Sequence, residues 1–114
     1  MKKQVMTIIT FLVIFGVVIL ASILINNKNQ GTSNEIAKCI GDNSILYTQL
    51  GCHACETQKE LFGESYNLLN EIDCYYTPEK CISENITATP TWIIKGEKYV
   101  GVHSIEQLQE LTNC

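Results

Sequence analysis

Residues 45–55 read ILYTQLGCHAC, a strand-like run that passes through a glycine into a Cys-x-x-Cys motif. The alternation over 45–50 predicts a β-strand, Gly51 breaks it, and the residues that follow favour helix. Cys52 is then placed at a helix N-terminus, where unpaired backbone N–H groups and the helix dipole favour a thiolate. Cys55 lies close enough to resolve a mixed disulfide. The stretch therefore predicts a dithiol redox centre.

A single Cys-x-x-Cys motif is also half of a zinc site, which needs four ligands. The candidates here are the motif and one further cysteine: Cys52, His53, Cys55, and Cys74 or Cys81. Adjacent Cys and His rarely bind one ion, and strand-like residues separate the two pairs. We therefore expect no metal, and no cofactor is implied.

An uncharged apolar segment, VMTIITFLVIFGVVILASILI, occupies residues 5–25. As a helix it spans about 30 Å, the thickness of the hydrocarbon core of a bilayer. Lys2 and Lys3 precede this segment, and only Lys28 follows it closely. This bias predicts that residues 1–4 lie in the cytoplasm and that the chain after the segment lies outside. A cleavable signal peptide is the alternative, but its apolar core is usually only about 7–15 residues long. We expect an uncleaved signal-anchor and a single-pass membrane protein.

Beyond the apolar segment the sequence predicts a tether and one small domain. Residues 26–38 are polar and read as a flexible linker, and residues 39–114 form the domain. The order of elements is β-α-β-α-β-β-α, a compact α/β sandwich. Strands are expected at 44–50, 71–76, 91–95 and 98–102, and helices at 53–69, 77–85 and 104–111, with a possible early stop at Gly63 and a capping box formed by Ser104 and Gln107.

Charge and cysteine content restrict the class of protein. After the apolar segment the chain has six lysines and twelve acidic residues, a formal charge of −6. This charge argues against binding to nucleic acid. All six cysteines lie on the same side of the apolar segment, which indicates an oxidising compartment and disulfide bonds.

Pro90 stands 35 residues beyond Cys55, directly before the strand-like run TWIIK. A proline cannot donate to a β-ladder and is expected at the first residue of a strand. This spacing, with the hairpin and helix that follow, matches a thioredoxin-like architecture, in which the proline is cis and packs beside the motif. An ordinary trans proline is the alternative; we expect the cis form for Thr89-Pro90.

Four stretches together resemble one kind of thioredoxin-like domain: YTQLGCHAC, ETQKELFG, TPTWIIKGEKYVGVHS and IEQLQEL, within residues 44–111. That domain accompanies bacterial and archaeal homologues of vitamin K epoxide reductase, fused to them or as a separate membrane-anchored partner. The resemblance implies that the domain forms disulfides in secreted proteins. The membrane enzyme then reoxidises it and passes the electrons to a quinone.

Carried onto this chain, the resemblance makes Cys52 the nucleophile, Cys55 the resolving thiol and Pro90 the cis-proline. His53, Ala54 and Thr89 would support the active site. Relatives often carry Pro or Gly between the two cysteines, whereas this chain carries His53-Ala54. The direction of electron flow therefore stays open, and a membrane-tethered reductase is one alternative. A non-catalytic binding module in which the motif is only a structural disulfide is another.

The remaining cysteines have structural and functional interpretations. Cys74 and Cys81 flank a strand and a short helix, so a local disulfide is favoured over a relay dithiol. Cys39 and Cys114 could join the two ends of the domain, although free thiols or an intermolecular bond stay open.

Three further residues carry weaker expectations. His53 has two interpretations: its imidazolium stabilises the Cys52 thiolate, or its side chain is exposed to solvent and has little effect on Cys52. We expect His103 to lie on the surface. Asn85 begins an N-glycosylation triplet, to which we assign no role.

Overall fold

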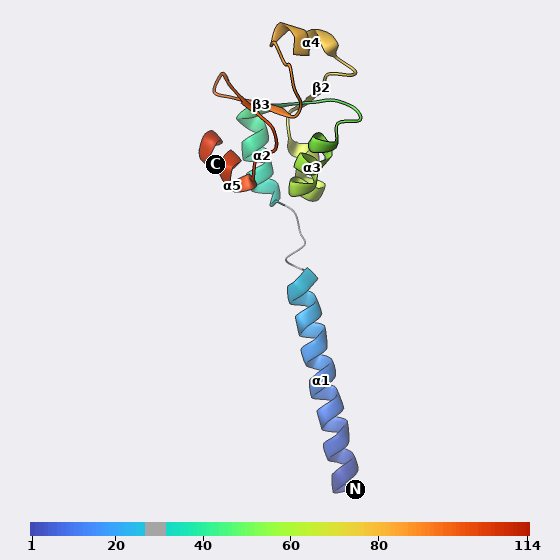
Figure 1. Cartoon of the computed structure of the whole chain (residues 1–114). Helices are drawn as coiled ribbons and strands as arrows, with labels where there is room; N and C mark the ends of the chain where they lie inside the picture. The colour runs from blue at the N-terminus through green and yellow to red at the C-terminus, as the bar shows by residue number, and fades with distance from the viewer. Residues whose placement is uncertain (27–31) are drawn as a thin grey trace. The chain divides into compact units, whose positions relative to one another are not determined.

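The computed structural model describes residues 1–26 and 32–114. The chain forms two compact units, of which the first contains the N-terminal helix and the second the remaining elements. In the first unit, α1 (Lys2–Asn26) contains an apolar span, Lys2–Ile25, long enough to cross a membrane, with a mean hydropathy of 3.1 (Figure 1). The hydroxyls of Thr7, Thr10 and Ser22 donate to the carbonyl oxygen four residues earlier, each at 2.8 Å. These polar groups are therefore satisfied within the helix, as a hydrocarbon environment requires.

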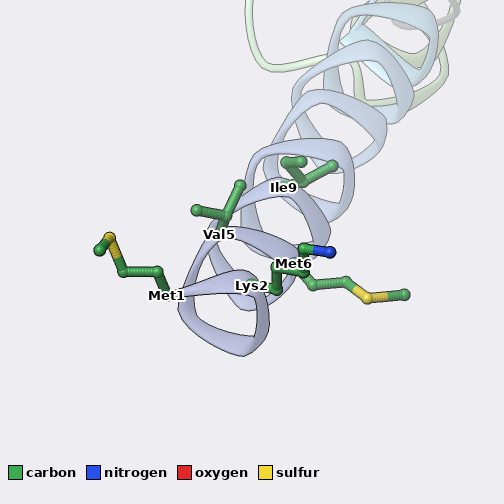
Figure 2. A pocket seen from close by; sticks show the side chains of 5 residues that line it. All are labelled: Met1, Lys2, Val5, Met6 and Ile9. Atoms are coloured by element: carbon green, nitrogen blue, oxygen red, sulfur yellow. The ribbon is translucent and has the colours of Figure 1, made fainter.

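The surface of α1 is apolar from its first turns onward. Figure 2 shows Val5, Met6 and Ile9 projecting outward from the helix, where with Met1 and Lys2 they line a shallow hollow. This hollow belongs to the side of a single helix. Its lining suits contact with lipid chains rather than with a polar ligand.

The second unit is built on a four-stranded sheet in the order β2-β1-β3-β4. The strands are β1 (Ser44–Thr48), β2 (Glu71–Asp73), β3 (Thr91–Ile94) and β4 (Glu97–Val100). β1 pairs parallel with β2 and antiparallel with β3, and β3 forms the hairpin with β4. A parallel pair requires a crossover, which α3 (His53–Phe62) and the 3₁₀ helix η1 (Gly63–Leu68) supply.

The helices divide between the two faces of the sheet. Figure 1 shows α2 (Asn34–Asp42), α3 and α5 (Ile105–Thr112) on one side of the strands and the short α4 (Pro78–Ser83) on the other. The first side holds the hydrophobic core, whose members are Ala37, Ile40, Leu46, Phe62, Leu69, Trp92, Ile94 and Leu108. The expected α/β sandwich with a thioredoxin-like order of strands is confirmed, and so is the capping box at Ser104 and Gln107.

The predicted linker over 26–38 is wrong in its second half. Residues 27–31 lie outside the described part of the chain, but α2 begins at Asn34, with the Ser33 hydroxyl accepting the Ile36 N–H. Ala37 and Ile40 are fully buried. The folded domain therefore starts before Cys39. The sequence does carry signals for this helix, since Ser33 is a capping residue and Ile36, Ala37 and Ile40 form one apolar face.

Gly41, in the last turn of α2, marks a close approach between two backbones. A Cβ added there would collide with the Leu68 carbonyl oxygen and lie 3.1 Å from the Leu69 Cα. Only a glycine lets α2 pack this closely against η1.

Several other boundaries differ from those predicted. The α-helix within 53–69 ends at Phe62, which confirms the early stop given as an alternative at Gly63; this residue adopts φ 57° and ψ −132°, a conformation that excludes side chains. The strands expected at 44–50 and 71–76 end earlier, at Thr48 and Asp73.

Candidate functional site

The reactive pair lies at the N-terminus of α3, where a disulfide joins Cys52 to Cys55 with 5.2 Å between their Cα atoms. Gly51, at φ +82°, turns the chain from β1 toward this helix. Cys52 is the N-cap residue, and its Sγ accepts the backbone N–H of Cys55 at 3.1 Å. The same N–H would stabilise a thiolate at Cys52 after the disulfide opens.

The two sulfurs differ in access. Cys55 is only 1% exposed, whereas Cys52 is partly exposed. An incoming thiol can therefore reach Cys52 far more easily than Cys55. His53 and Ala54, between them, are both exposed. The effect of His53 on the thiolate stays a prediction.

The Thr89–Pro90 peptide bond is cis, as expected, and it lies beside the reactive pair. The Thr89 carbonyl oxygen is 3.5 Å from the Sγ of Cys52. The carbonyl of the buried Pro90 accepts the N–H of Gly101 at 2.8 Å, so the loop after β4 is fastened to the same segment. The structure thus brings Cys52, Cys55, Thr89 and Pro90 together, although they are far apart in sequence.

The other four cysteines form two disulfides away from this pair. Cys74 bonds Cys81 across β2 and α4, and Cys39 of α2 bonds Cys114 just after α5. The Cys74–Cys81 bridge is the local disulfide that the sequence favoured, and Cys39 and Cys114 form the bridge that was one of several alternatives. Within residues 1–26 and 32–114, no three His, Cys, Asp or Glu side chains are placed to hold one metal ion.

His103 does not lie on the surface as expected. It is half-buried, and its Nε2 is buried without a hydrogen-bond partner. Its ring packs edge-on against Tyr99, with 6.3 Å between the ring centres. The loop between β4 and α5 folds inward at this point because the buried side chain of Gln58 binds the His103 backbone.

Gln58 is a residue of the site that sequence reasoning missed. It lies three positions after Cys55 on the same face of α3 and is fully buried. A buried glutamine must satisfy an amide group, so its presence on an apolar helix face was the available signal.

A cluster of charged and polar side chains joins α3 to the strands β1 and β2. The Glu71 carboxylate accepts the Thr48 hydroxyl and lies 3.3 Å from the Lys59 Nζ. Burial by itself raises the pKa of Glu71, but the Thr48 hydrogen bond and the Lys59 charge outweigh burial and hold this pKa below its ordinary value. A carboxyl whose pKa is lowered in the folded state stabilises the fold above its unfolded-state pKa, and this contribution is lost as the pH falls through the folded-state pKa.

We expect Glu71→Gln to lower the free energy of unfolding by about 1–2 kcal/mol at pH 7, since a charged hydrogen bond and an ion pair are lost. The difference from the wild type should shrink as the pH falls from the ordinary glutamate pKa of about 4.3 through the lower folded-state pKa, where the wild-type carboxyl becomes protonated. Urea unfolding at pH 7 and at stepped pH values below 4 measures both. Glu56→Gln is the control: this carboxylate lies 3.5 Å from the same Lys59 Nζ but is 64% exposed, so its loss should cost less than about 0.5 kcal/mol. A gap between Glu71→Gln and wild type that does not narrow as the pH is lowered below 4 would contradict the prediction.

The strand order, the helices on both faces and the cis-proline beside an N-terminal cysteine pair define a thioredoxin-like domain. A close cysteine pair on this fold fits a redox-related role. No protein-family model matches the sequence. Among solved structures, the chain is similar to the NTD_N/C domain of alkylhydroperoxide reductase AhpF from Enterococcus faecalis, with 18% identity and a TM-score of 0.46. The match covers 74% of this chain and 46% of that one, so the chain spans less than half the length of that structure.

Proposed function

We propose that this chain is a membrane-anchored thiol–disulfide oxidoreductase that forms disulfides in secreted proteins outside the cytoplasm. A membrane protein similar to vitamin K epoxide reductase would reoxidise it. One observation carries the proposal: a disulfide in which the sulfur of the partly exposed Cys52 caps a helix and lies 3.5 Å from the carbonyl before a cis-proline, while Cys55 is buried.

The reaction consists of two exchanges at sulfur. A substrate thiolate attacks the Cys52 Sγ, the Cys52–Cys55 bond breaks, and Cys55 leaves as a thiolate. A second substrate thiolate attacks the substrate sulfur of this mixed disulfide, and Cys52 leaves as a thiolate that the Cys55 N–H stabilises. Two electrons then reside in the domain as two thiols. A disulfide of the membrane partner takes them by the reverse exchange.

The anchor and the cysteine content support this location. Confining the domain to the membrane plane with α1 raises its effective concentration near a membrane partner. All six cysteines are engaged in disulfides, a state that an oxidising compartment maintains. The two lysines before the apolar span favour a cytoplasmic N-terminus, with the domain on the opposite side.

The direction of electron flow depends on the reduction potential of the Cys52–Cys55 pair. A value near −120 to −180 mV matches known oxidants of protein thiols, whereas a value near −270 mV matches the reductant thioredoxin. We expect the oxidising range. Equilibration of the full-length protein with glutathione, followed by mass analysis of the alkylated peptide that contains both cysteines, measures it.

Trapping tests the proposed exchange directly. In Cys55→Ala the Cys52 thiolate can still attack a disulfide of a secreted protein or of the membrane partner, and one sulfur of that disulfide leaves as a thiolate. No Cys55 thiol remains to displace the bound protein, so mixed disulfides at Cys52 should accumulate in the membranes of the native host. Non-reducing gels should then show adducts with secreted proteins and with one membrane protein. The control, Cys52→Ala with Cys55→Ala, should show none. If Cys55→Ala forms no adducts beyond this control, the proposed function is wrong and the motif is only a structural disulfide.

A further inference from the structure

The Gln58 side chain connects the reactive helix to two segments distant from it in sequence. Its Oε1 accepts the indole Nε1–H of Trp92 at 3.1 Å and the backbone N–H of His103 at 2.8 Å. Its Nε2 donates to the His103 carbonyl at 3.0 Å. One buried amide thus joins α3 to β3 and to the loop that precedes α5.

One of these segments reaches the reactive sulfur through the Thr89 carbonyl, and the other is hydrogen-bonded to that segment. Trp92 follows Pro90 by two residues in one continuous segment, and the loop is tied back to Pro90 through the N–H of Gly101. Gln58 and Pro90 therefore hold residues 101–103 from both ends. The position of the Thr89 carbonyl relative to Cys52 depends on how β3 sits against α3, which Gln58 helps to fix.

The activation of Cys52, by contrast, is local to the first turn of α3. It rests on the helix N-terminus and on the Cys55 N–H, and neither involves Gln58. Exchange with a polypeptide therefore has two requirements. One is a reactive sulfur, which α3 supplies, and the other is a surface beside it, formed by Thr89, Pro90 and the 101–103 loop, against which the polypeptide lies.

We propose that Gln58 is a positioning residue for polypeptide substrates: it fixes the Thr89–Pro90 segment and the 101–103 loop against the reactive helix. This inference rests on the proposed thiol–disulfide exchange. Its loss would leave Cys52 chemically competent but would displace the surfaces that align a cysteine-containing peptide. Displacements of about 1 Å in such surfaces can cost up to a hundredfold in rate.

The test compares two thiols on the full-length protein: glutathione and an unstructured peptide with a single cysteine. Gln58→Met keeps the length of the side chain and removes all three hydrogen bonds. We expect it to slow the opening of the Cys52–Cys55 disulfide by the peptide about tenfold or more, and to change the glutathione rate less than about twofold, since the local activation is intact. Stopped-flow quenching and alkylation give both rate constants.

Glu60→Met, on an exposed position of the same helix, is the matched control and should leave both rates unchanged. Gln58→Glu keeps the acceptor oxygen for Trp92 and His103 and loses the donor to the His103 carbonyl. If Gln58→Met does not fold, the peptide and glutathione rates of Gln58→Glu provide the same test. Equal rates in variant and wild type would show that Gln58 only fills the core. Equal slowing with both thiols would also overturn the inference, because it would place the effect on the reactive pair itself. A wild-type protein that reacts with neither thiol would refute the proposed function instead.

Discussion

Cys52→Ser is expected to remove all measurable thiol–disulfide exchange, because a serine hydroxyl neither forms a disulfide nor ionises at neutral pH. Cys55, the remaining thiol of the pair, is 1% exposed and cannot take its place. The measurement is oxidation of a reduced peptide with two cysteines by stoichiometric protein. Residual exchange at more than the uncatalysed rate would show that another disulfide carries the reaction, and the Cys74–Cys81 pair would then be the first to examine.

The matched variant Cys55→Ser keeps Cys52 and the backbone N–H that points at its sulfur. We expect the pKa of its Cys52 thiol to lie well below the ordinary value of about 8.5, because the helix N-terminus and the Cys55 N–H stabilise the thiolate. The rate of alkylation with iodoacetamide as a function of pH reports this ionisation. The proposed activation predicts a plateau at neutral pH. A profile that still rises steeply through pH 8.5 would contradict it.

The reactive pair could be found from sequence because its chemistry depends on adjacent residues. Gly51, Cys52 and Cys55 specify a turn, a helix N-terminus and a dithiol within five positions, and the structure places them so. Pro90 was found by its place before a β-branched run, a local signal combined with spacing. The sequence favours the Cys74–Cys81 bridge because the two residues are close along the chain, but it leaves the partners of Cys39 and Cys114 open.

Features that depend on tertiary contacts were missed. Helix α2 has a capping serine and an apolar face that the sequence can show, but a helix of nine residues becomes stable only when Ala37 and Ile40 pack into the core. The sequence shows Gln58 as a polar residue on an apolar helix face, but only the fold brings its partners Trp92 and His103 against it. His103 was placed on the surface because nothing near it in sequence indicates that the loop turns inward. In each case the contact that determines the structure is made with a residue more than 25 positions away in sequence, or with the hydrophobic core as a whole.

Replacing Cys39 and Cys114 by serine is expected to produce the largest loss of stability in this domain. Their disulfide closes a loop with a sequence separation of 75 residues, which joins α2 to the chain after α5. Restricting the unfolded chain over a loop of that length stabilises a protein by about 4 kcal/mol, whereas the complete stability of a domain this small is roughly 4–12 kcal/mol. The variant should therefore unfold at a much lower urea concentration, monitored by the fluorescence of Trp92.

The control for this prediction is Cys74→Ser with Cys81→Ser, whose disulfide spans a separation of only 7 residues. The same loop-closure argument gives it about 2–3 kcal/mol, so the two double variants should differ by about 2 kcal/mol. A larger loss for the short loop would mean that its bridge stabilises the turn after β2 through native contacts and not through chain entropy.

The longer bridge also fixes α2 against α5, and both helices cover the face of the sheet that carries Trp92. Its removal is therefore expected to loosen the core beneath the reactive helix, while the short bridge lies on the α4 side of the sheet and should leave that core intact.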